Sequence, residues 1–262
     1  MQYNQLGNSD LQVSKIGLGA LHHGVYLGLK ESEKLINRAL DLGINFIETA
    51  PIYGKGCSES FIGTAIRQKR SQIIISTKVG LKATSSPDGD FGVEVQALTK
   101  KHVKESAEHS LTSLRSDYID LLQLHAFDPT TALEETIEAL EELCQEGKIR
   151  YFGCSNYSPE ELEVLLTCES SYFISCHAHY NIFERMVEKE LLPICSSNEL
   201  GVICNRVLAR GILSSKYLKG CIPKNSRAAQ SNRIRKLLDP DVLEMVKVLQ
   251  DWAKEKQITV TP

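Results

Sequence analysis

The sequence has 262 residues, with 42% hydrophobic residues, 24% charged residues and a formal net charge of −3. This length suits a single α/β barrel with a large buried core. The charge gives no indication of a nucleic-acid or membrane partner, and no apolar run reaches the roughly 18 residues of a membrane span. The first ten residues lack the pattern of a signal peptide, so we expect a cytoplasmic protein.

Predicted strands and helices alternate along the chain. A hairpin is expected at Tyr3–Val13, centred on Gly7-Asn8. Apolar, β-rich runs then predict strands at Ile16–Leu21, Ile44–Thr49, Ile73–Val79, Tyr118–His125, Ile149–Ser155, Tyr172–His177 and Gly201–Leu208. Helical patterns lie between them at Glu31–Leu42, Ser58–Lys69, Thr99–Leu114, Leu133–Glu146, Pro159–Cys168 and Val187–Asn198.

This alternation predicts a parallel sheet, and seven β-α units favour a barrel over an open sheet. We expect one barrel domain over residues 1–262. Leu218–Leu237 is basic and irregular, which indicates a long loop; a solvated loop is one reading, but loops of this length in a compact domain are more often functional. A helix is predicted at Val242–Lys256, but no eighth strand follows before the sequence ends at Pro262. We expect either a chain truncated at its C-terminus, or a barrel that something else completes.

The eight cysteines form no C-x-x-C pair, and the seven histidines form no H-x-x-x-H pair. Cys154, Cys176 and Cys204 lie inside apolar runs, where a free thiol packs like a small hydrophobic side chain. We therefore expect buried thiols rather than disulfides, and no metal site.

Ionisable side chains stand at the ends of three successive predicted strands. Glu48 ends the second strand and is followed by Tyr53, Lys78 ends the third, and His125 ends the fourth. In a barrel these ends meet at one mouth. A lysine beside a tyrosine hydroxyl stabilises the phenolate, which suits the tyrosine to donating a proton. Taken singly, a tyrosine after a strand is a packing residue and a strand-end histidine is a satisfied core residue; their joint placement favours a site.

Several segments resemble the aldo-keto reductase family. They are Gly43–Gly54 with Ser58, Glu59 and Gly63, then Ile75–Lys78, Asp117–His125, Gly153–Asn156, Tyr180-Asn181 and Leu208–Leu213. The resemblance runs in order along the chain. It implies a (β/α)8 TIM barrel, in this chain lacking the eighth strand and C-terminal helices. It also implies hydride transfer from NAD(P)H to an aldehyde or ketone.

The resemblance assigns a role to each matching residue. Tyr53 would be the general acid, Lys78 would tune it, Glu48 would pair with the lysine, and His125 would orient the substrate carbonyl. The cofactor would contact Ser155 and Asn156 through its carboxamide and Leu208 and Gly211 through its pyrophosphate. Lys216 and Arg227 would supply cationic contacts, and Gly19 and Ala20 would border the nicotinamide pocket. NADP is the expected cofactor because the family uses it most, with NAD as the alternative.

Some positions depart from the family's pattern. Glu48 stands where the family has Asp, His177 where it usually has Gln, and Asn205 where it usually has an aromatic platform for the nicotinamide. Arg206 and Val207 replace a small hydroxyl residue and a proline. The resemblance implies that residues for the adenosine 2′-phosphate would lie on a last strand and helices beyond Pro262, so we do not expect the sequence to distinguish NADP from NAD.

Two other functions stay open. Glu48 and Asn205 fit a nucleotide-binding or regulatory protein with weak catalysis, as in the potassium-channel β-subunit relatives of the family. A lyase or isomerase acting on a sugar phosphate would use the same barrel but would need a phosphate site after the seventh and eighth strands. The polar stretch Ala83–Gly92 hints at a polar small-molecule substrate. The substrate itself and the oligomeric state do not follow from the sequence.

Overall fold

The computed structural model describes residues 1–85 and 91–261 and divides into two compact units. Unit 1 comprises residues 1–84, 93–178 and 188–203, and unit 2 comprises residues 85–92, 179–187 and 204–262. The polar stretch Ala83–Gly92 lies partly outside the described part of the chain, which excludes residues 86–90. In the described residues no helix is long and apolar enough to cross a membrane.

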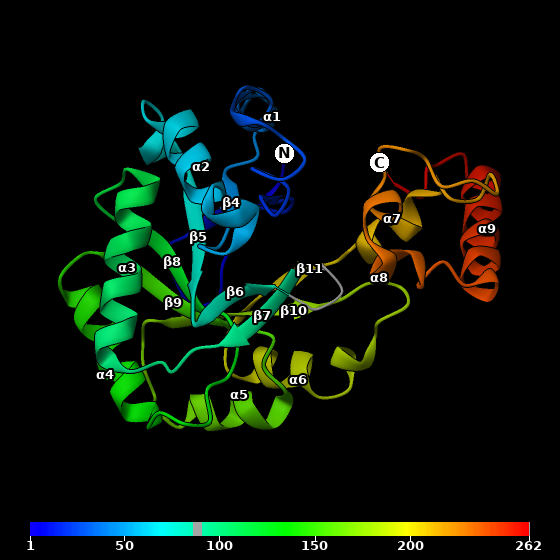
Figure 1. Cartoon of the computed structure of the whole chain (residues 1–262). Helices are drawn as coiled ribbons and strands as arrows, with labels where there is room; N and C mark the ends of the chain where they lie inside the picture. The colour runs from blue at the N-terminus through cyan, green and yellow to red at the C-terminus, as the bar shows by residue number, and fades with distance from the viewer. Residues whose placement is uncertain (86–90, 262) are drawn as a thin grey trace. The chain divides into compact units, whose positions relative to one another are not determined.

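Seven strands of the described residues form a parallel sheet, in the order β11-β10-β9-β8-β5-β4-β3 (Figure 1). A strand order that follows the chain is the pattern of a β/α barrel, so the predicted fold class is confirmed. The strands are β3 (Leu18–Gly19), β4 (Phe46–Glu48), β5 (Ile74–Val79), β8 (Ile119–Leu124), β9 (Ile149–Ser155), β10 (Phe173–His179) and β11 (Gly201–Asn205).

The register places the polar strand ends side by side. Gly19 on β3 pairs with Glu48 on β4, which in turn pairs with Ser76 on β5. Lys78 lies two residues after Ser76 and pairs with Gln123 on β8. Side chains alternate between the two faces of a strand, so neighbouring strands in this register bring their C-terminal polar residues to one face and one edge. The sheet thereby positions the predicted site.

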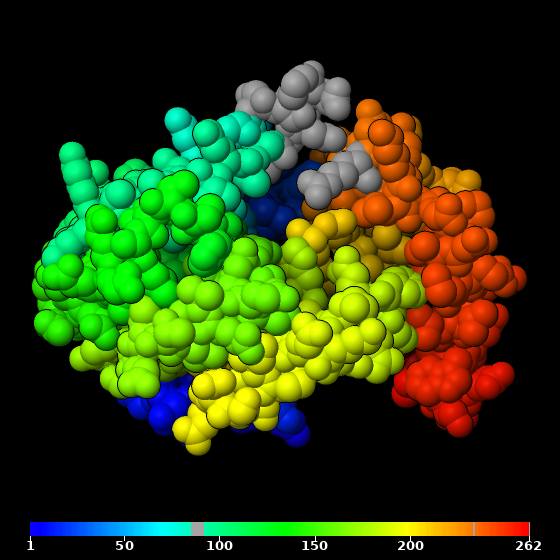
Figure 2. Space-filling model, turned by 90° about the horizontal axis from the view of Figure 1, so that it is seen from below, coloured from blue at the N-terminus to red at the C-terminus, as the bar shows by residue number. Residues whose placement is uncertain are grey.

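Six helices follow the strands of unit 1 and cover the sheet. They are α1 (Leu29–Asp41), α2 (Ser58–Ile66), α3 (Lys100–Leu114), α4 (Leu133–Gln145), α5 (Pro159–Leu166) and α6 (Leu191–Ser197). Local sequence sets their starts: Thr99 caps α3, and Ser158 and Glu161 form a capping box ahead of α5. Figure 2 shows α4 to α6, coloured green to yellow, as an outer layer of the unit.

The N-terminal hairpin pairs β1 (Tyr3–Gln5) with β2 (Gln12–Ser14), as predicted. Its turn residue Gly7 has φ +57°, and a Cβ there would clash with the carbonyl oxygen of Ile174, so glycine permits the close approach. Leu6, Leu11 and Val13 of the hairpin join Phe46, Leu121 and Ile174 of the sheet in one hydrophobic cluster.

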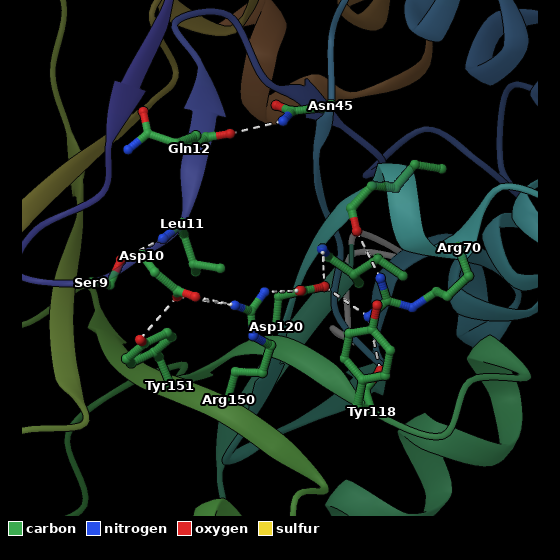
Figure 3. Close-up of polar contacts among 12 residues, drawn as sticks. Ser9, Asp10, Leu11, Gln12, Asn45, Arg70, Tyr118, Asp120, Arg150 and Tyr151 are labelled. Carbon is green, nitrogen blue, oxygen red and sulfur yellow. Dashed lines mark hydrogen bonds and ion pairs between the residues drawn. The ribbon is translucent and has the colours of Figure 1, made fainter.

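An ion-pair network lies near the N-terminal ends of β5, β8 and β9 (Figure 3). Asp120, only 2% exposed, accepts hydrogen bonds from Arg70 at 2.7 Å, Arg150 at 3.1 Å and the backbone N–H of Ile75 at 2.9 Å. Arg150 also reaches Asp10 of the hairpin at 2.8 Å. Since a buried carboxylate needs charged or hydrogen-bonding partners, this network connects the hairpin to the sheet.

Several element predictions were wrong in detail. The first strand has only Leu18 and Gly19, and a hairpin of β6 (Leu81–Ser85) and β7 (Phe91–Val95) was not predicted. The predicted loop Leu218–Leu237 contains two four-residue helices, α7 (Arg227–Gln230) and α8 (Asn232–Arg235).

Unit 2 has its own small core. Ile212 and Leu213, in the 3-10 helix η4 (Ala209–Ser214), pack with Val246 of α9 (Pro240–Glu255). Asp239 caps α9 by accepting a hydrogen bond from the N–H of Asp241 at 2.9 Å.

The cysteine prediction holds only in part. Cys154, Cys176 and Cys195 are buried free thiols, whereas Cys204 and Cys221 are exposed. The prediction for Cys204 was wrong because its apolar run, GVICN, lies on a strand whose residues are not fully covered.

Candidate functional site

Lys78 is the centre of a buried polar cluster at the C-terminal ends of β4 and β5. Its ammonium group donates hydrogen bonds to a carboxylate oxygen of Glu48, to the backbone carbonyl of Thr49 at 2.9 Å and to the hydroxyl of Tyr53 at 3.3 Å. The Lys78 side chain has no exposed surface, whereas that of Glu48 is 14% exposed. An ammonium group has three donors, so these three acceptors satisfy it completely.

Burial sets the electrostatics of this cluster. It holds the pKa of Lys78 well below the usual value, because a buried ammonium group loses its hydration. The adjoining carboxylate of Glu48 opposes that effect by favouring the charged lysine.

Tyr53 stands at the first position of the 3-10 helix η1 (Tyr53–Gly56), directly after β4 and its short turn. The next residue, Gly54, has φ +62°, and a Cβ there would clash with the carbonyl oxygen of His23. Glycine therefore permits both the left-handed backbone and the close approach. This turn aims the tyrosine ring back at Lys78, whose ammonium group lies 4.8 Å from the ring centroid.

His125 follows β8 and is only 6% exposed. Its ring meets that of Tyr53 edge to face, with centroids 6.0 Å apart. Burial, reinforced by the positive charge of Lys78, lowers the pKa of His125 to about 2. The imidazole is therefore neutral at physiological pH and has one N–H to donate, which suits it to hydrogen bonding a carbonyl oxygen.

Ser155, Asn156 and His177 form a second polar group at the ends of β9 and β10. The hydroxyl of Ser155 lies 3.2 Å from Nδ1 of His177, and the two residues are partners in the sheet register. The amide of Asn156 donates to the backbone carbonyl of His125 at 2.8 Å and to Ser155 Oγ at 3.1 Å. The hydrogen bond to His125 connects this group to the histidine of the first cluster.

Gly19 and Ala20 border the first cluster from β3. Ala20 donates its backbone N–H to the carbonyl of Glu48 at 2.8 Å, and its own carbonyl accepts from Ser58 at 3.0 Å. A Cβ at Gly19 would lie 3.6 Å from Oε2 of Glu48, so glycine leaves space beside that oxygen.

The other predicted cofactor residues belong to unit 2. Asn205 ends β11, and its buried side-chain oxygen Oδ1 has no hydrogen-bond partner among the described residues. Leu208 precedes η4, Gly211 lies within it, and Arg227 begins α7. A Cβ at Gly211 would lie 3.2 Å from the ammonium nitrogen of Lys216, so this lysine folds over the glycine backbone.

The structure thus brings Glu48, Tyr53, Lys78 and His125 together within unit 1. Sequence reasoning missed the backbone carbonyl of Thr49, since every residue carries such a carbonyl and it leaves no mark in the sequence. It also missed the role of Gly54 in the turn, although a glycine directly after Tyr53 could have indicated a left-handed backbone there.

A cavity of about 200 Å³ in unit 1 adjoins this cluster. Its lining includes Lys78 and His125 together with the polar residues Gln96 and, on α3, Glu105 and His109. Leu81, two residues before the polar stretch Ala83–Gly92, also lines it.

The whole chain except its first residues matches a family model. The model is that of the Aldo/keto reductase family, and it matches residues 15–262. The chain belongs to this family. The family assignment predicted from the motifs is therefore confirmed.

The proteins similar to this chain include both enzymes and a channel subunit. An uncharacterised oxidoreductase of Bacillus subtilis is 36% identical, over 83% of this chain and 68% of its own length. A probable voltage-gated potassium channel β subunit of Arabidopsis thaliana is 35% identical, over 99% of this chain and 81% of its own. The solved glycerol dehydrogenase of Gluconobacter oxydans is 29% identical with a TM-score of 0.83, covering 99% of this chain and 80% of that chain.

Proposed function

We propose that this aldo/keto reductase catalyses the NAD(P)H-dependent reduction of an aldehyde or ketone, or the reverse oxidation of the alcohol. Tyr53 is the proton donor, Lys78 sets its ionisation, Glu48 pairs with Lys78, and His125 orients the carbonyl. The observation that carries the proposal is the Tyr53 hydroxyl, 3.3 Å from the buried ammonium nitrogen of Lys78 and beside the neutral imidazole of His125. A hydroxyl in this setting is suited to general acid catalysis.

The residues present fit a nicotinamide dinucleotide. Lys216 folded over Gly211 offers a cation beside open backbone, which suits a pyrophosphate. Within unit 1, the polar group of Ser155, Asn156 and His177 suits a carboxamide. When bound, the nicotinamide would supply the hydride. NADP is our choice over NAD on the family's usage, and Arg227 is assigned to the same cofactor.

A titration tests this proposal. Purified protein is titrated with NADPH and with NADH while nucleotide fluorescence is followed, and a panel of aldehydes and ketones is then added while nucleotide absorbance is recorded. We expect tight binding of NADPH and turnover with at least one carbonyl compound. Absence of binding to either nucleotide would contradict the proposal.

The second candidate is a nucleotide-binding protein of weak activity that regulates a partner. The similarity to the Arabidopsis channel subunit over nearly the whole chain favours it, as does Asn205 in place of an aromatic platform. Nucleotide binding without turnover across the whole panel would select this function over the first.

A further inference from the structure

Glu48 reaches the hydroxyl of Tyr53 as well as the ammonium group of Lys78. The Tyr53 hydroxyl lies 3.2 Å from Oε1 of Glu48, within hydrogen-bond distance. Asp, the family's residue at this position, is one methylene shorter, and a C–C bond is about 1.5 Å long. The direct contact between the carboxylate and the tyrosine is therefore a property of the longer side chain in this protein.

The direction of the hydrogen bonds follows from the donors that are present. Lys78 has donors alone, and it donates to Glu48, to the Thr49 carbonyl and to the Tyr53 oxygen. The tyrosine oxygen thus accepts from the lysine, and the tyrosine's own proton is directed at the carboxylate, which only accepts.

From this geometry we infer that Glu48 accepts a hydrogen bond from the hydroxyl of Tyr53 and thereby holds the tyrosine in its protonated, proton-donating form up to a higher pH. The inference rests on the proposed function of Tyr53 and adds a role for Glu48 beyond pairing with Lys78. A carboxylate beside a phenol stabilises the neutral phenol by a charge-assisted hydrogen bond and repels the phenolate.

The other charged groups around Tyr53 act in the opposite direction or lie further back. The ammonium group of Lys78 favours the phenolate, while His125 is neutral because its pKa is about 2. His23 lies behind the turn, where its carbonyl adjoins Gly54, and burial lowers its pKa, so it is also neutral. Lys55 is exposed on the same turn. Glu48, by contrast, places a negative charge beside the hydroxyl and so opposes Lys78.

Glu48 is also the member of the pair with access to water. Its side chain is 14% exposed, whereas that of Lys78 is fully enclosed. Glycine at position 19, its register partner, leaves space beside Oε2. The carboxylate is therefore hydrated on one side while it accepts the hydrogen bond of the tyrosine hydroxyl on the other.

The test is a spectroscopic titration of the protein without nucleotide. Tyrosinate absorbance is recorded from pH 7 to 12 for the wild type and Tyr53→Phe, and their difference isolates Tyr53. The same difference is measured in Glu48→Asp and Glu48→Gln backgrounds, with Glu134→Asp on the exposed face of α4 as the matched control. Circular dichroism establishes that each variant is folded.

We expect the ionisation midpoint of Tyr53 to fall by about one pH unit in Glu48→Asp, corresponding to a tenfold change in the ionisation equilibrium. It falls in Glu48→Gln as well, and it is unchanged in Glu134→Asp. The alkaline limb of kcat/KM for carbonyl reduction moves down by the same amount in Glu48→Asp. An unchanged midpoint in folded Glu48→Asp would overturn the inference. If no variant reduces a carbonyl compound, the proposed function fails, and the nucleotide-free titration still decides the role of Glu48.

Discussion

The side-chain amide of Asn156 donates a hydrogen bond to the backbone carbonyl of His125, 2.8 Å away. This bond joins the residue after β9 to the residue after β8, so it fixes the two halves of the proposed site to each other. Asn156 itself has φ +61°, a left-handed conformation that asparagine tolerates better than most residues.

Replacing Asn156 therefore has two separable effects. Asn156→Ala and Asn156→Gly both lose the amide's hydrogen bonds to the His125 carbonyl and to Ser155 Oγ, and Asn156→Ala also strains the left-handed backbone, which glycine adopts freely. We expect both variants to raise KM for the carbonyl substrate, and Asn156→Ala to be less stable than Asn156→Gly by about 1 kcal/mol. Steady-state kinetics and denaturant unfolding measure the two quantities. Wild-type KM in both variants would show that this bond does not position His125.

The ion-pair network around Asp120, at the N-terminal ends of the strands, should affect stability and leave activity unchanged. Asp120→Asn keeps the shape of the side chain but leaves Arg70 without its buried counter-charge, 2.7 Å away. We expect the free energy of unfolding to fall by about 3 kcal/mol, while KM values measured at low temperature stay unchanged. Asp10→Asn is the matched control, since its side chain is 67% exposed and its ion pair with Arg150 contributes little. A loss in Asp10→Asn as large as that in Asp120→Asn would contradict this account.

Acid should destabilise the protein through His125. Its pKa is about 2 in the folded protein, because of burial and the charge of Lys78, against about 6.5 when unfolded. As the pH falls below about 6.5 the unfolded chain gains a proton that the folded protein does not take up. Stability is therefore present above that pH and is lost progressively toward pH 2, by up to about 1.4 kcal/mol per pH unit.

Denaturant unfolding between pH 4.5 and 7 checks this slope. We expect His125→Asn to have a shallower slope than the wild type by up to one proton per molecule. The low pKa values of His23 and His179 have the same sign and remain in both proteins, so the difference isolates His125. Equal slopes would mean that His125 is protonated in the fold.

Lys78→Met should separate proton donation from nucleotide binding. Methionine fills a similar volume, but it removes the ammonium group that contacts Tyr53 and Glu48. We expect carbonyl reduction to fall by at least about a hundredfold, while the Kd for NADPH changes by less than about threefold. Fluorescence titration and steady-state kinetics give both values. Loss of binding parallel to loss of turnover would place Lys78 on the cofactor instead.

The sequence predicted the sheet well where apolar runs are covered on both sides. The bounds of β9 are those predicted, Ile149–Ser155, although Arg150 interrupts its apolar run. The prediction failed at β3, where only Leu18 and Gly19 pair, and at the β6-β7 hairpin, whose strands have only five residues each. Helices of four residues, such as α7, are too short for a periodic signal.

The same limit applies to the site. Strand ends predicted that Glu48, Tyr53, Lys78 and His125 would meet, because parallel strands end at one edge. The hydrogen bond between Tyr53 and Glu48 was not predictable in this way, since it depends on the side-chain conformation of Glu48 and on the turn at Gly54. Neither leaves a pattern in the sequence.

The central claim is that Tyr53 donates the proton in carbonyl reduction, and one comparison tests it most directly. Tyr53→Phe removes only the hydroxyl, so NADPH is bound first in both proteins and the decay of its absorbance is then recorded after an aldehyde is added. The account predicts an unchanged Kd for NADPH and a rate at least about a hundredfold below that of the wild type. A Tyr53→Phe protein that reduces the aldehyde at the wild-type rate would contradict the account.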